Sequence, residues 1–234
     1  MPFLRNLPLT LTPLDLIALA VLALAWFGVG RIIANPPQRR PSVSVLMKWY
    51  RREWMRQFVS RDPRIFDGNI LATLREGTAF YASACLIALG GGLALLGNID
   101  PLMGLARELE AAAIPILLWK LKLLLVLLLV ANAYLKFVWS HRLFGWCAIM
   151  MAAVPNDPGD PRALPRALAA AEVNINAARN FNIGLRSLYF ALGATGWLGG
   201  PWGLLAGTGV VVVMTLLREF ASPSRKAILR DMSG

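Results

Sequence analysis

The chain has 234 residues, of which 57% are hydrophobic and only 16% are charged. A soluble domain has about a quarter of its residues charged, and here the apolar residues fall in long blocks with a mean hydropathy of +0.56, so the sequence excludes an ordinary soluble domain. The formal net charge is +11, but the basic residues flank the apolar blocks, where they orient membrane helices; we therefore expect no nucleic-acid partner.

The first predicted membrane span covers residues 14–33. Thr12 and Asp15 have the spacing of a capping box, which marks a helix start at the membrane interface. A cleaved signal peptide is the alternative, since Ala23-Leu24-Ala25 resembles a cleavage site. The basic residues follow the apolar run, from Arg31 onward, and this order favours a retained helix with its N-terminus outside.

Residues 42–70 form the largest polar segment and are predicted to hold an amphipathic helix on the cytoplasmic side. Apolar and aromatic residues recur there at helical spacing, at Val43, Met47, Tyr50, Trp54 and Phe58. Such a helix lies in the headgroup plane, with the bilayer and its anionic lipid head groups as partners. The alternative is a surface helix that packs against the transmembrane bundle. Asp67-Gly68, near the end of the segment, is predicted as a turn.

Two further spans are predicted at 72–96 and 116–138. In the first of them, Gly90-Gly91-Gly92 either loosens the helix or forms a packing notch, and the notch is the preferred interpretation. The second is a Leu/Val block long enough to cross a hydrocarbon core of about 30 Å. Its helix is expected to continue to about Met151.

The last third of the chain predicts an asparagine-rich helix at 164–182, followed by a helical hairpin. The spans of the hairpin are placed at 183–198 and 202–217. Its break is Gly199-Gly200-Pro201-Trp202-Gly203, in the middle of an apolar run too long for one crossing.

The distribution of basic residues favours five spans over four. With the N-terminus outside, the segments predicted inside hold ten, six and four basic residues, which is 20 of the 24. The predicted fold is therefore all-α: a single transmembrane domain over residues 1–234, with about five membrane-spanning helices and an amphipathic interfacial helix. We expect it in a bacterial inner membrane with its C-terminus in the cytoplasm.

The sequence carries no recognisable motif for catalysis, cofactor binding or metal binding. It has a single histidine, His141, and its two cysteines, Cys85 and Cys147, lie in apolar surroundings. It contains neither a P-loop nor a nucleophile elbow. We therefore expect no catalytic, cofactor-binding or metal-binding residues, and no enzyme.

Polar residues gather near the predicted inner leaflet. Glu76 enters the second span, Arg142 leaves the third, and Asn182 and Arg186 enter the fourth. Charges at this depth are costly and face partners or water. One hypothesis is a latch in which Glu76 pairs with Arg142 or Arg186; the alternative is a pocket for a head group, an anion or a substrate. Asn132, in mid-span, is expected to make an interhelical hydrogen bond or, alternatively, to belong to a conduction path.

Four strings of the sequence stand out together: RDPRIFD at 61–67, TAFYAS at 78–83, WSHRLF at 139–144 and FNIGLRSLYFAL at 181–192. They resemble a bacterial integral membrane family known as domain of unknown function 599, over about residues 12–220. The resemblance implies an integral inner-membrane protein and supplies no activity. It assigns to the candidate polar cluster five residues of the family's pattern: Asp67, Arg142, Asn182, Arg186 and Tyr189.

Three function classes follow from these observations. The leading one is an interaction or accessory protein, a homo-oligomer or part of a membrane-protein complex, because stripes such as Gly203 and Gly207 supply packing faces. The second is a channel or transporter for a small solute or ion, and the third is a membrane enzyme. A polar cavity that reaches Asn132 from Arg186 would favour transport, and a dry bundle with an exposed small-residue face would favour association.

Overall fold

The computed structural model describes residues 11–100 and 115–232, and within these ranges it contains helices and no strand. The helices in chain order are α1 (Pro13–Ala34), α2 (Val43–Ser60), α3 (Ile65–Gly97), α5 (Ile116–Ala152), α6 (Ala163–Thr195), the short 3-10 helix η2 (Gly196–Gly199), α7 (Pro201–Phe220) and α8 (Pro223–Asp231). The predicted all-α fold is confirmed.

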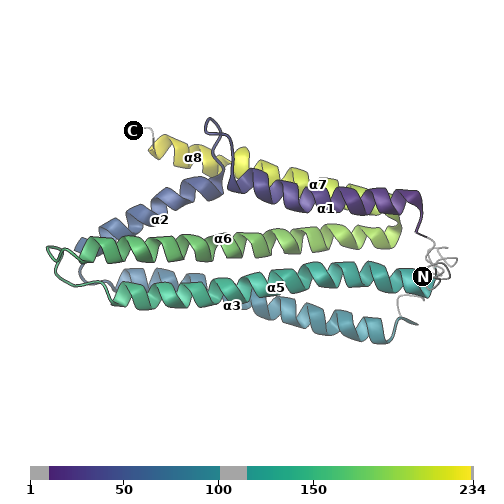
Figure 1. The fold of residues 1–234 in the computed structure, drawn as a ribbon, viewed down its shortest axis with the longest axis horizontal. Coiled ribbons are helices and arrows are strands. Elements are labelled where there is room, and N and C mark those ends of the chain that lie inside the picture. Colours follow the sequence, from purple (N-terminus) through teal and green to yellow (C-terminus); the bar gives the residue numbers. More distant parts are fainter. Residues whose placement is uncertain (1–10, 101–114, 233–234) are drawn as a thin grey trace, which may run out of the picture.

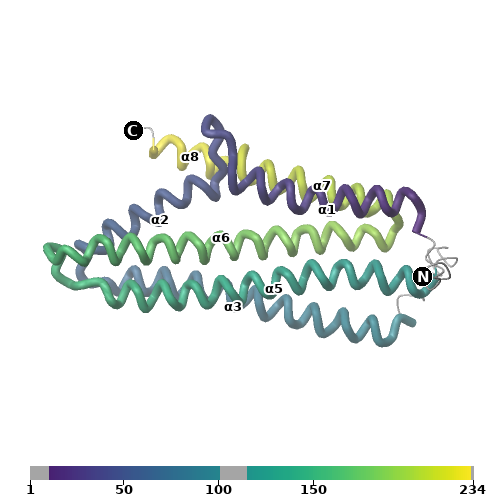
Figure 2. The backbone as a smooth tube through the Cα atoms, viewed as in Figure 1, coloured from purple at the N-terminus to yellow at the C-terminus, as the bar shows by residue number. Residues whose placement is uncertain are grey.

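The helices form an elongated bundle with α6 near its centre (Figure 1). Helices α5 and α6 run antiparallel side by side; α3 packs on α5, and α1 pairs with α7 (Figure 2). The 37 residues of α5 make a rod of about 55 Å at about 1.5 Å per residue. A hydrocarbon core is about 30 Å thick, so the bundle continues well beyond the membrane at one end.

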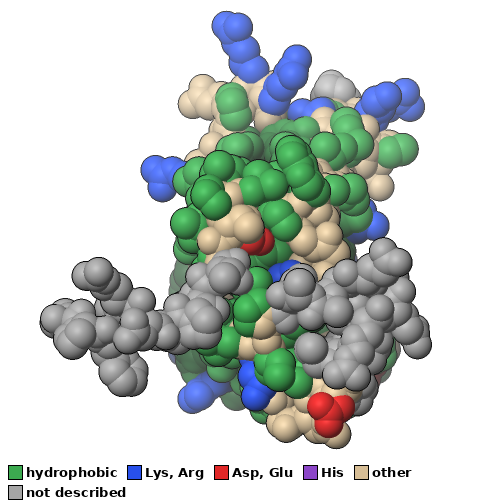
Figure 3. All heavy atoms as spheres, turned by 90° about the vertical axis from the view of Figure 1, so that its right-hand side faces the viewer, with side chains coloured by type: hydrophobic (Ala, Val, Ile, Leu, Met, Phe, Trp, Pro, Cys, Tyr) green, Lys and Arg blue, Asp and Glu red, His purple; other side chains and the backbone are tan. Residues whose placement is uncertain are grey.

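Four stretches of the described chain are long and apolar enough to cross a membrane: α1, α3, α5, and α7 with α8. Large apolar side chains point outward along them, including Leu24, Phe80, Ile87 and Val210, and hydrophobic side chains dominate the surface seen end-on in Figure 3. A helix that is apolar on all sides suits a lipid environment. The chain is therefore a multi-pass membrane protein. Hydropathy supports four crossings, and the predicted fifth depends on α6, which is too polar to join this set.

Local hydrogen bonds fix the helix ends. The Thr12 hydroxyl accepts from the Asp15 N–H at 3.1 Å while the Asp15 carboxylate accepts from the Thr12 N–H at 3.0 Å, which closes the predicted capping box. Ser42 caps α2 and donates to the Ile33 carbonyl at 2.8 Å, so the start of α2 is tied to the end of α1. Gly200 has φ 98°, a conformation that glycine adopts without strain, and turns the chain into α7.

Two predicted boundaries are wrong. Asp67-Gly68 is not a turn but lies inside α3, where the Asp67 carboxylate is held by side chains of the preceding segment. The predicted helix at 164–182 and the predicted span at 183–198 are one continuous helix, α6. Its asparagines do not break it because they bond along the helix or to neighbouring helices, as Asn180 does to the Asn176 carbonyl at 2.9 Å. The predicted continuation of α5 is confirmed, since that helix ends at Ala152.

Two hydrophobic cores occupy the two parts of the bundle. The core of the membrane part is formed by α1, α5, α6 and α7 around Phe137 and Phe190. In the projecting part, α2 buries Met55 and Phe58 against α5 and α6. This core includes a row of buried alanines on α6 that lets its neighbours approach closely: Ala163, Ala167, Ala170, Ala171 and Ala177. The amphipathic segment thus packs against the bundle, as the second of its two interpretations predicts.

Glycines bring α6 and η2 into backbone contact with α7. A Cβ on Gly207 would lie 2.2 Å from the Gly193 carbonyl oxygen, and one on Gly203 would lie 2.1 Å from that of Gly196. No side chain fits at this spacing. The glycine stripe that the sequence analysis assigned to association is therefore used inside the chain.

The glycine run of α3 behaves as a notch at one position. A Cβ on Gly92 would lie 2.2 Å from the Leu127 side chain of α5, whereas Gly90 and Gly91 have no such neighbour within 4 Å. The helix continues through all three. The packing notch is confirmed, and it is set by Gly92.

Candidate functional site

A cavity of about 890 Å³ lies where α1 ends and α2 begins, at the junction of the two cores. Its walls come from α1, α2, α3, α5 and α6, with one side chain from α7. Its charged and amide-bearing residues are Arg31, Asn35, Lys48, Arg51, Asn132, Lys136, Arg179, Asn182, Arg186 and Glu219. The volume suits a ligand of some tens of atoms.

Helix periodicity places these side chains together. The stripes are Ser44, Lys48 and Arg51 on α2, Asn132 and Lys136 on α5, and Arg179, Asn182 and Arg186 on α6. Residues three or four apart share one face of a helix. Three helices therefore each turn a polar stripe toward one space.

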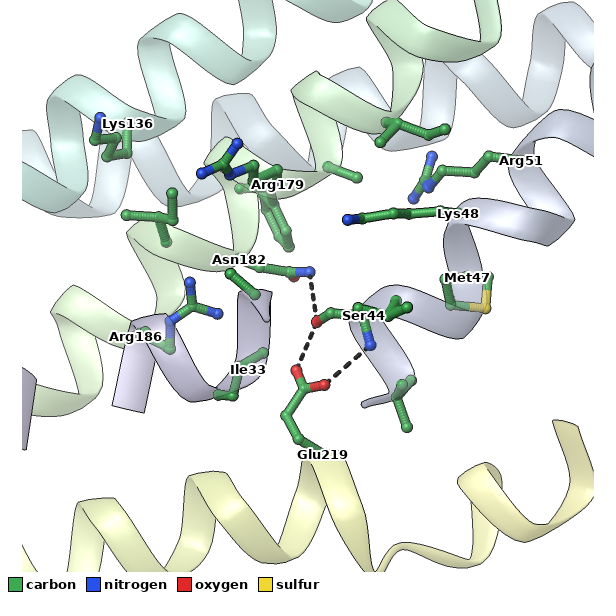
Figure 4. Close-up of a pocket in the computed structure, with 18 of the residues that line it drawn as sticks. Ile33, Ser44, Met47, Lys48, Arg51, Lys136, Arg179, Asn182, Arg186 and Glu219 are labelled. Atoms are coloured by element: carbon green, nitrogen blue, oxygen red, sulfur yellow. Dashed lines mark hydrogen bonds between the residues drawn. The ribbon is translucent and has the colours of Figure 1, made fainter. Parts of the chain in front are cut away.

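The cavity holds six cations and one carboxylate. Figure 4 shows Lys48 of α2 with Arg179 and Arg186 of α6 in the lining of this one cavity. In the described ranges, the ion pairs within 4 Å lie elsewhere: Arg52–Glu172, Arg56–Glu53, Arg61–Asp67 and Arg162–Asp160. Burial lowers the pKa of Arg51, because its charge is withdrawn from water. Like charges in a shielded cleft create a strong positive potential that attracts anions.

The single carboxylate, Glu219, is engaged by the start of α2. The Ser44 N–H donates to Glu219 Oε2 at 2.9 Å, and the Ser44 hydroxyl donates to Oε1 at 2.7 Å. Asn182 Nδ2 donates to Ser44 Oγ at 3.5 Å (Figure 4). The Glu219 carboxylate, which belongs to α7, thus contacts the first turn of α2. The dipole of α2 favours negative charge at that end of the helix. Glu219 also attracts Arg186, without forming an ion pair with it, so it fixes the wall and leaves the cations largely uncompensated.

A hydrogen-bonded layer between α5 and α6 closes the cavity toward the middle of the membrane. Asn132 Nδ2 donates to Ser187 Oγ at 3.0 Å, and the Ser187 hydroxyl donates to the Leu129 carbonyl at 2.8 Å. Ser187 is fully buried. The predicted interhelical hydrogen bond of Asn132 is confirmed, and the same residue lines the cavity. These hydrogen bonds join α5 to α6 directly beside the cavity.

A second polar cluster is buried at the opposite end, near the starts of α1 and α5. The Asp15 carboxylate accepts from Trp197 Nε1 at 2.7 Å. The Lys122 side chain, in a residue only 2% exposed, places its ammonium 5.1 Å from the ring centroid of Trp119 and 5.9 Å from that of Trp197. The opposite charges of Asp15 and Lys122 attract each other. The cation–π contacts and this attraction offset the cost of burying the two charges.

Three of the seven predicted cluster residues meet at the cavity: Asn132, Asn182 and Arg186. Asn182 and Arg186 were expected at similar depth near the inner leaflet and Asn132 in mid-span, and all three line the same cavity. The structure adds that they come from two adjacent helices and face the cations of α2.

Two of the predicted residues lie outside the cavity in local contacts. Asp67 is fully buried in the projecting part, where its Oδ1 accepts from Trp54 Nε1 at 2.6 Å and from Arg61. The Tyr189 hydroxyl accepts from Arg218 at 3.0 Å. These contacts join α2 to α3 and α6 to α7, so both residues have structural roles here.

The predicted latch of Glu76 is wrong. Among the residues that the structure describes, no ion pair joins Glu76 to Arg142 or Arg186. Glu76 is exposed on α3. Arg142 is exposed as well, and its guanidinium lies 5.9 Å from the ring centroid of Trp139 and 5.2 Å from that of Trp146. The alternative of a pocket at this depth fits the structure.

Sequence reasoning did not assign Lys48, Arg51, Arg179 and Glu219 to this site. It read the cations of α2 as contacts to lipid head groups, although they recur at the same spacing as the polar residues of α6. That shared spacing could have indicated that the polar faces of α2 and α6 meet. No local pattern marks Glu219 as a site residue, because its partner Ser44 lies 175 residues away in the sequence.

The family model described as "Protein of unknown function, DUF599" matches residues 17–224. The chain belongs to this family. Every cavity-lining residue of this DUF599 protein falls within the matched range, and the family description supplies no activity. No curated protein and no solved structure matches the chain.

Proposed function

We propose that this DUF599 protein is an inner-membrane transport protein whose cavity takes up an anionic substrate from the cytoplasmic side. The observation that carries the proposal is the cavity itself, with six cations and one engaged carboxylate, extending from Arg186 to Asn132. A carrier in one of its access states is open on one side of its site and sealed on the other. The layer at Asn132 and Ser187 supplies that seal.

The orientation follows from the positive-inside rule. The cations of the cavity belong to the basic segments that the sequence analysis places in the cytoplasm. In this topology the C-terminal half of α6, which packs beside α1, α5 and α7, is the fifth crossing. A reporter fused to the C-terminus is then active only in the cytoplasm, and activity on the outer side would overturn the topology.

Binding, and not catalysis, is the chemistry that these side chains favour. The lining offers cations, amides and hydroxyls, and both oxygens of Glu219 accept hydrogen bonds from Ser44, which disfavours it as a general base. Association through the Gly203 and Gly207 stripe is disfavoured as well, because α6 and η2 cover it.

Calorimetry with inorganic pyrophosphate tests the site. We expect one pyrophosphate per chain, and a loss of about tenfold or more in affinity for Lys48→Gln and for Arg186→Gln, since a charged hydrogen bond contributes about 1.5–3 kcal/mol. Arg56→Gln is the matched control, because Arg56 lies on α2, is exposed and pairs with Glu53 at 3.3 Å. Equal affinity in all variants would contradict the proposal.

Thiol labelling separates transport from static binding. In a background with Cys85 and Cys147 replaced by alanine, Ser187→Cys places a thiol at the sealed end of the cavity. A carrier that opens alternately exposes this thiol to a membrane-impermeant reagent from the cytoplasmic side and, in its other state, from outside. If the thiol is labelled from neither side while substrate binds, the protein binds its ligand without alternating access, and the transport proposal fails.

A further inference from the structure

The wall of the cavity includes a side that faces lipid. Phe27 on α1 lines the cavity and is 69% exposed. Thr73 on α3 also lines it and is exposed. Two glycines widen the same walls, Gly30 on α1 and Gly77 on α3, and neither would have a neighbour within 4 Å of an added Cβ. Because α1 and α3 carry membrane spans, this wall of the cavity faces the bilayer.

The lining combines cationic and apolar side chains. Four of the six cations belong to α2 and α6, and the other two are Arg31 on α1 and Lys136 on α5. Apolar and aromatic side chains from all five helices line the same space: Trp26, Phe27, Met47, Leu74, Phe144 and Phe181. A bare inorganic anion would satisfy only the cations and would leave most of an 890 Å³ space to water or lipid. A ligand with both a charged head and an apolar body matches both kinds of lining.

The cations also indicate which anion fits. Guanidinium groups form paired hydrogen bonds with phosphate oxygens, and a lysine adds a point charge. Arg179, Arg186 and Lys48 line one cavity from two helices (Figure 4). A phosphoryl group offers several oxygens in different directions, as this arrangement requires.

We propose that the occupant is an anionic membrane lipid with a terminal phosphate, whose phosphoryl head lies among Lys48, Arg179 and Arg186 and whose chain leaves the cavity between α1 and α3. The proposal rests on the proposed function and names its substrate class. The lipid enters sideways from the inner leaflet, so its chain need not leave the hydrocarbon.

Native mass spectrometry of the detergent-purified chain tests the proposal with dioleoyl phosphatidic acid, dioleoyl phosphatidylcholine and inorganic phosphate as probes. One phosphatidic acid per chain is expected, retained at least tenfold better than phosphatidylcholine and not displaced by millimolar phosphate. Gly77→Leu fills the lipid-facing wall without removing a cation. It should abolish retention of phosphatidic acid while pyrophosphate still binds. Gly91→Leu, on the same helix and also in open space, is the matched control and should behave as wild type.

Three results would overturn the inference. Equal retention of the two lipids would mean adhesion to apolar surface only. Displacement of phosphatidic acid by phosphate alone would mean that the ligand is a soluble anion, which leaves the proposed function intact. Unchanged retention in Gly77→Leu would remove the sideways route. If pyrophosphate and phosphatidic acid both fail to bind, the proposed function fails with the inference.

Discussion

Replacing Gly207 by alanine should separate α7 from α6. The added Cβ would lie 2.2 Å from the Gly193 carbonyl oxygen, whereas ordinary contacts of a Cβ begin at 3.4 Å. The backbones therefore have to move apart by about 1.2 Å, and no flexible side chain is available to yield. Overpacking of this kind costs about 1–3 kcal/mol, so we expect a fall in melting temperature of roughly 5 °C for a chain of this size.

The two buried cysteines provide the assay. Cys85 and Cys147 are both free and buried, so a thiol-reactive dye added to the protein in detergent reports unfolding. The control is Gly91→Ala, which meets open space in α3 and should be neutral or stabilising by about 0.5–1 kcal/mol, because glycine is a poor helix former. A Gly207→Ala protein that melts at or above the wild-type temperature would refute the backbone contact between α6 and α7.

Three further substitutions test buried and exposed polar contacts by the same melting assay. Trp197→Phe removes the indole donor to Asp15 Oδ1, while Thr12 donates to Oδ2 only. It should cost about 1.5–3 kcal/mol, as expected for a hydrogen bond to a charged group, and an unchanged melt would mean that Asp15 Oδ1 finds water instead. Trp54→Phe removes one donor to Asp67, which keeps its arginine partner, so the cost should be smaller, about 1 kcal/mol, and a larger loss would show that the tryptophan dominates. Glu76→Gln should leave the free energy of unfolding within about 0.5 kcal/mol of the wild-type value, as for other surface substitutions. Clear destabilisation would indicate that Glu76 does form a stabilising ion pair.

The features that the sequence predicts well have local causes. The start of α1 follows from Thr12 and Asp15, which are three residues apart and bond to each other. The turn into α7 follows from Gly200, whose backbone conformation is rare for other residues. Membrane spans with a continuous apolar composition can be predicted without knowing which helices they contact. Their length and hydropathy alone have to match the hydrocarbon core.

The features that it misses depend on contacts between distant segments. Asp67 looks like a turn residue until Trp54 and the end of α2 are placed against it. The boundary predicted between residues 182 and 183 is absent because the backbone of α6 stays helical through it, and the Asn182 side chain donates to Ser44, which lies 138 residues away. Gly203 packs against Gly196 of the same chain and not against a partner. The glycine spacing is the same in both cases, so only the pairing of the helices shows which one applies.

The candidate site shows the same division. Asn132 and Arg186 are recognisable as polar residues within or beside membrane spans. Their meeting with Lys48 requires α2 to fold back across α6, and this depends on the burial of Met55 and Phe58 in the projecting core. An amphipathic pattern has the same period whether its apolar face meets lipid or protein, so the pattern alone does not decide between them.

The most direct test of the account measures the distance between a bound phosphate and the arginines of the cavity. The protein, labelled with ¹⁵N at arginine side chains, is reconstituted with phosphatidic acid, and phosphorus–nitrogen dipolar couplings are recorded by solid-state NMR. The account predicts a phosphorus within about 4 Å of guanidinium nitrogen, as charge-assisted contacts of about 2.8 Å imply, and loss of that coupling when Arg179 and Arg186 are both replaced by glutamine. A coupling that persists in the double variant, or no coupling in the wild-type protein, would contradict it.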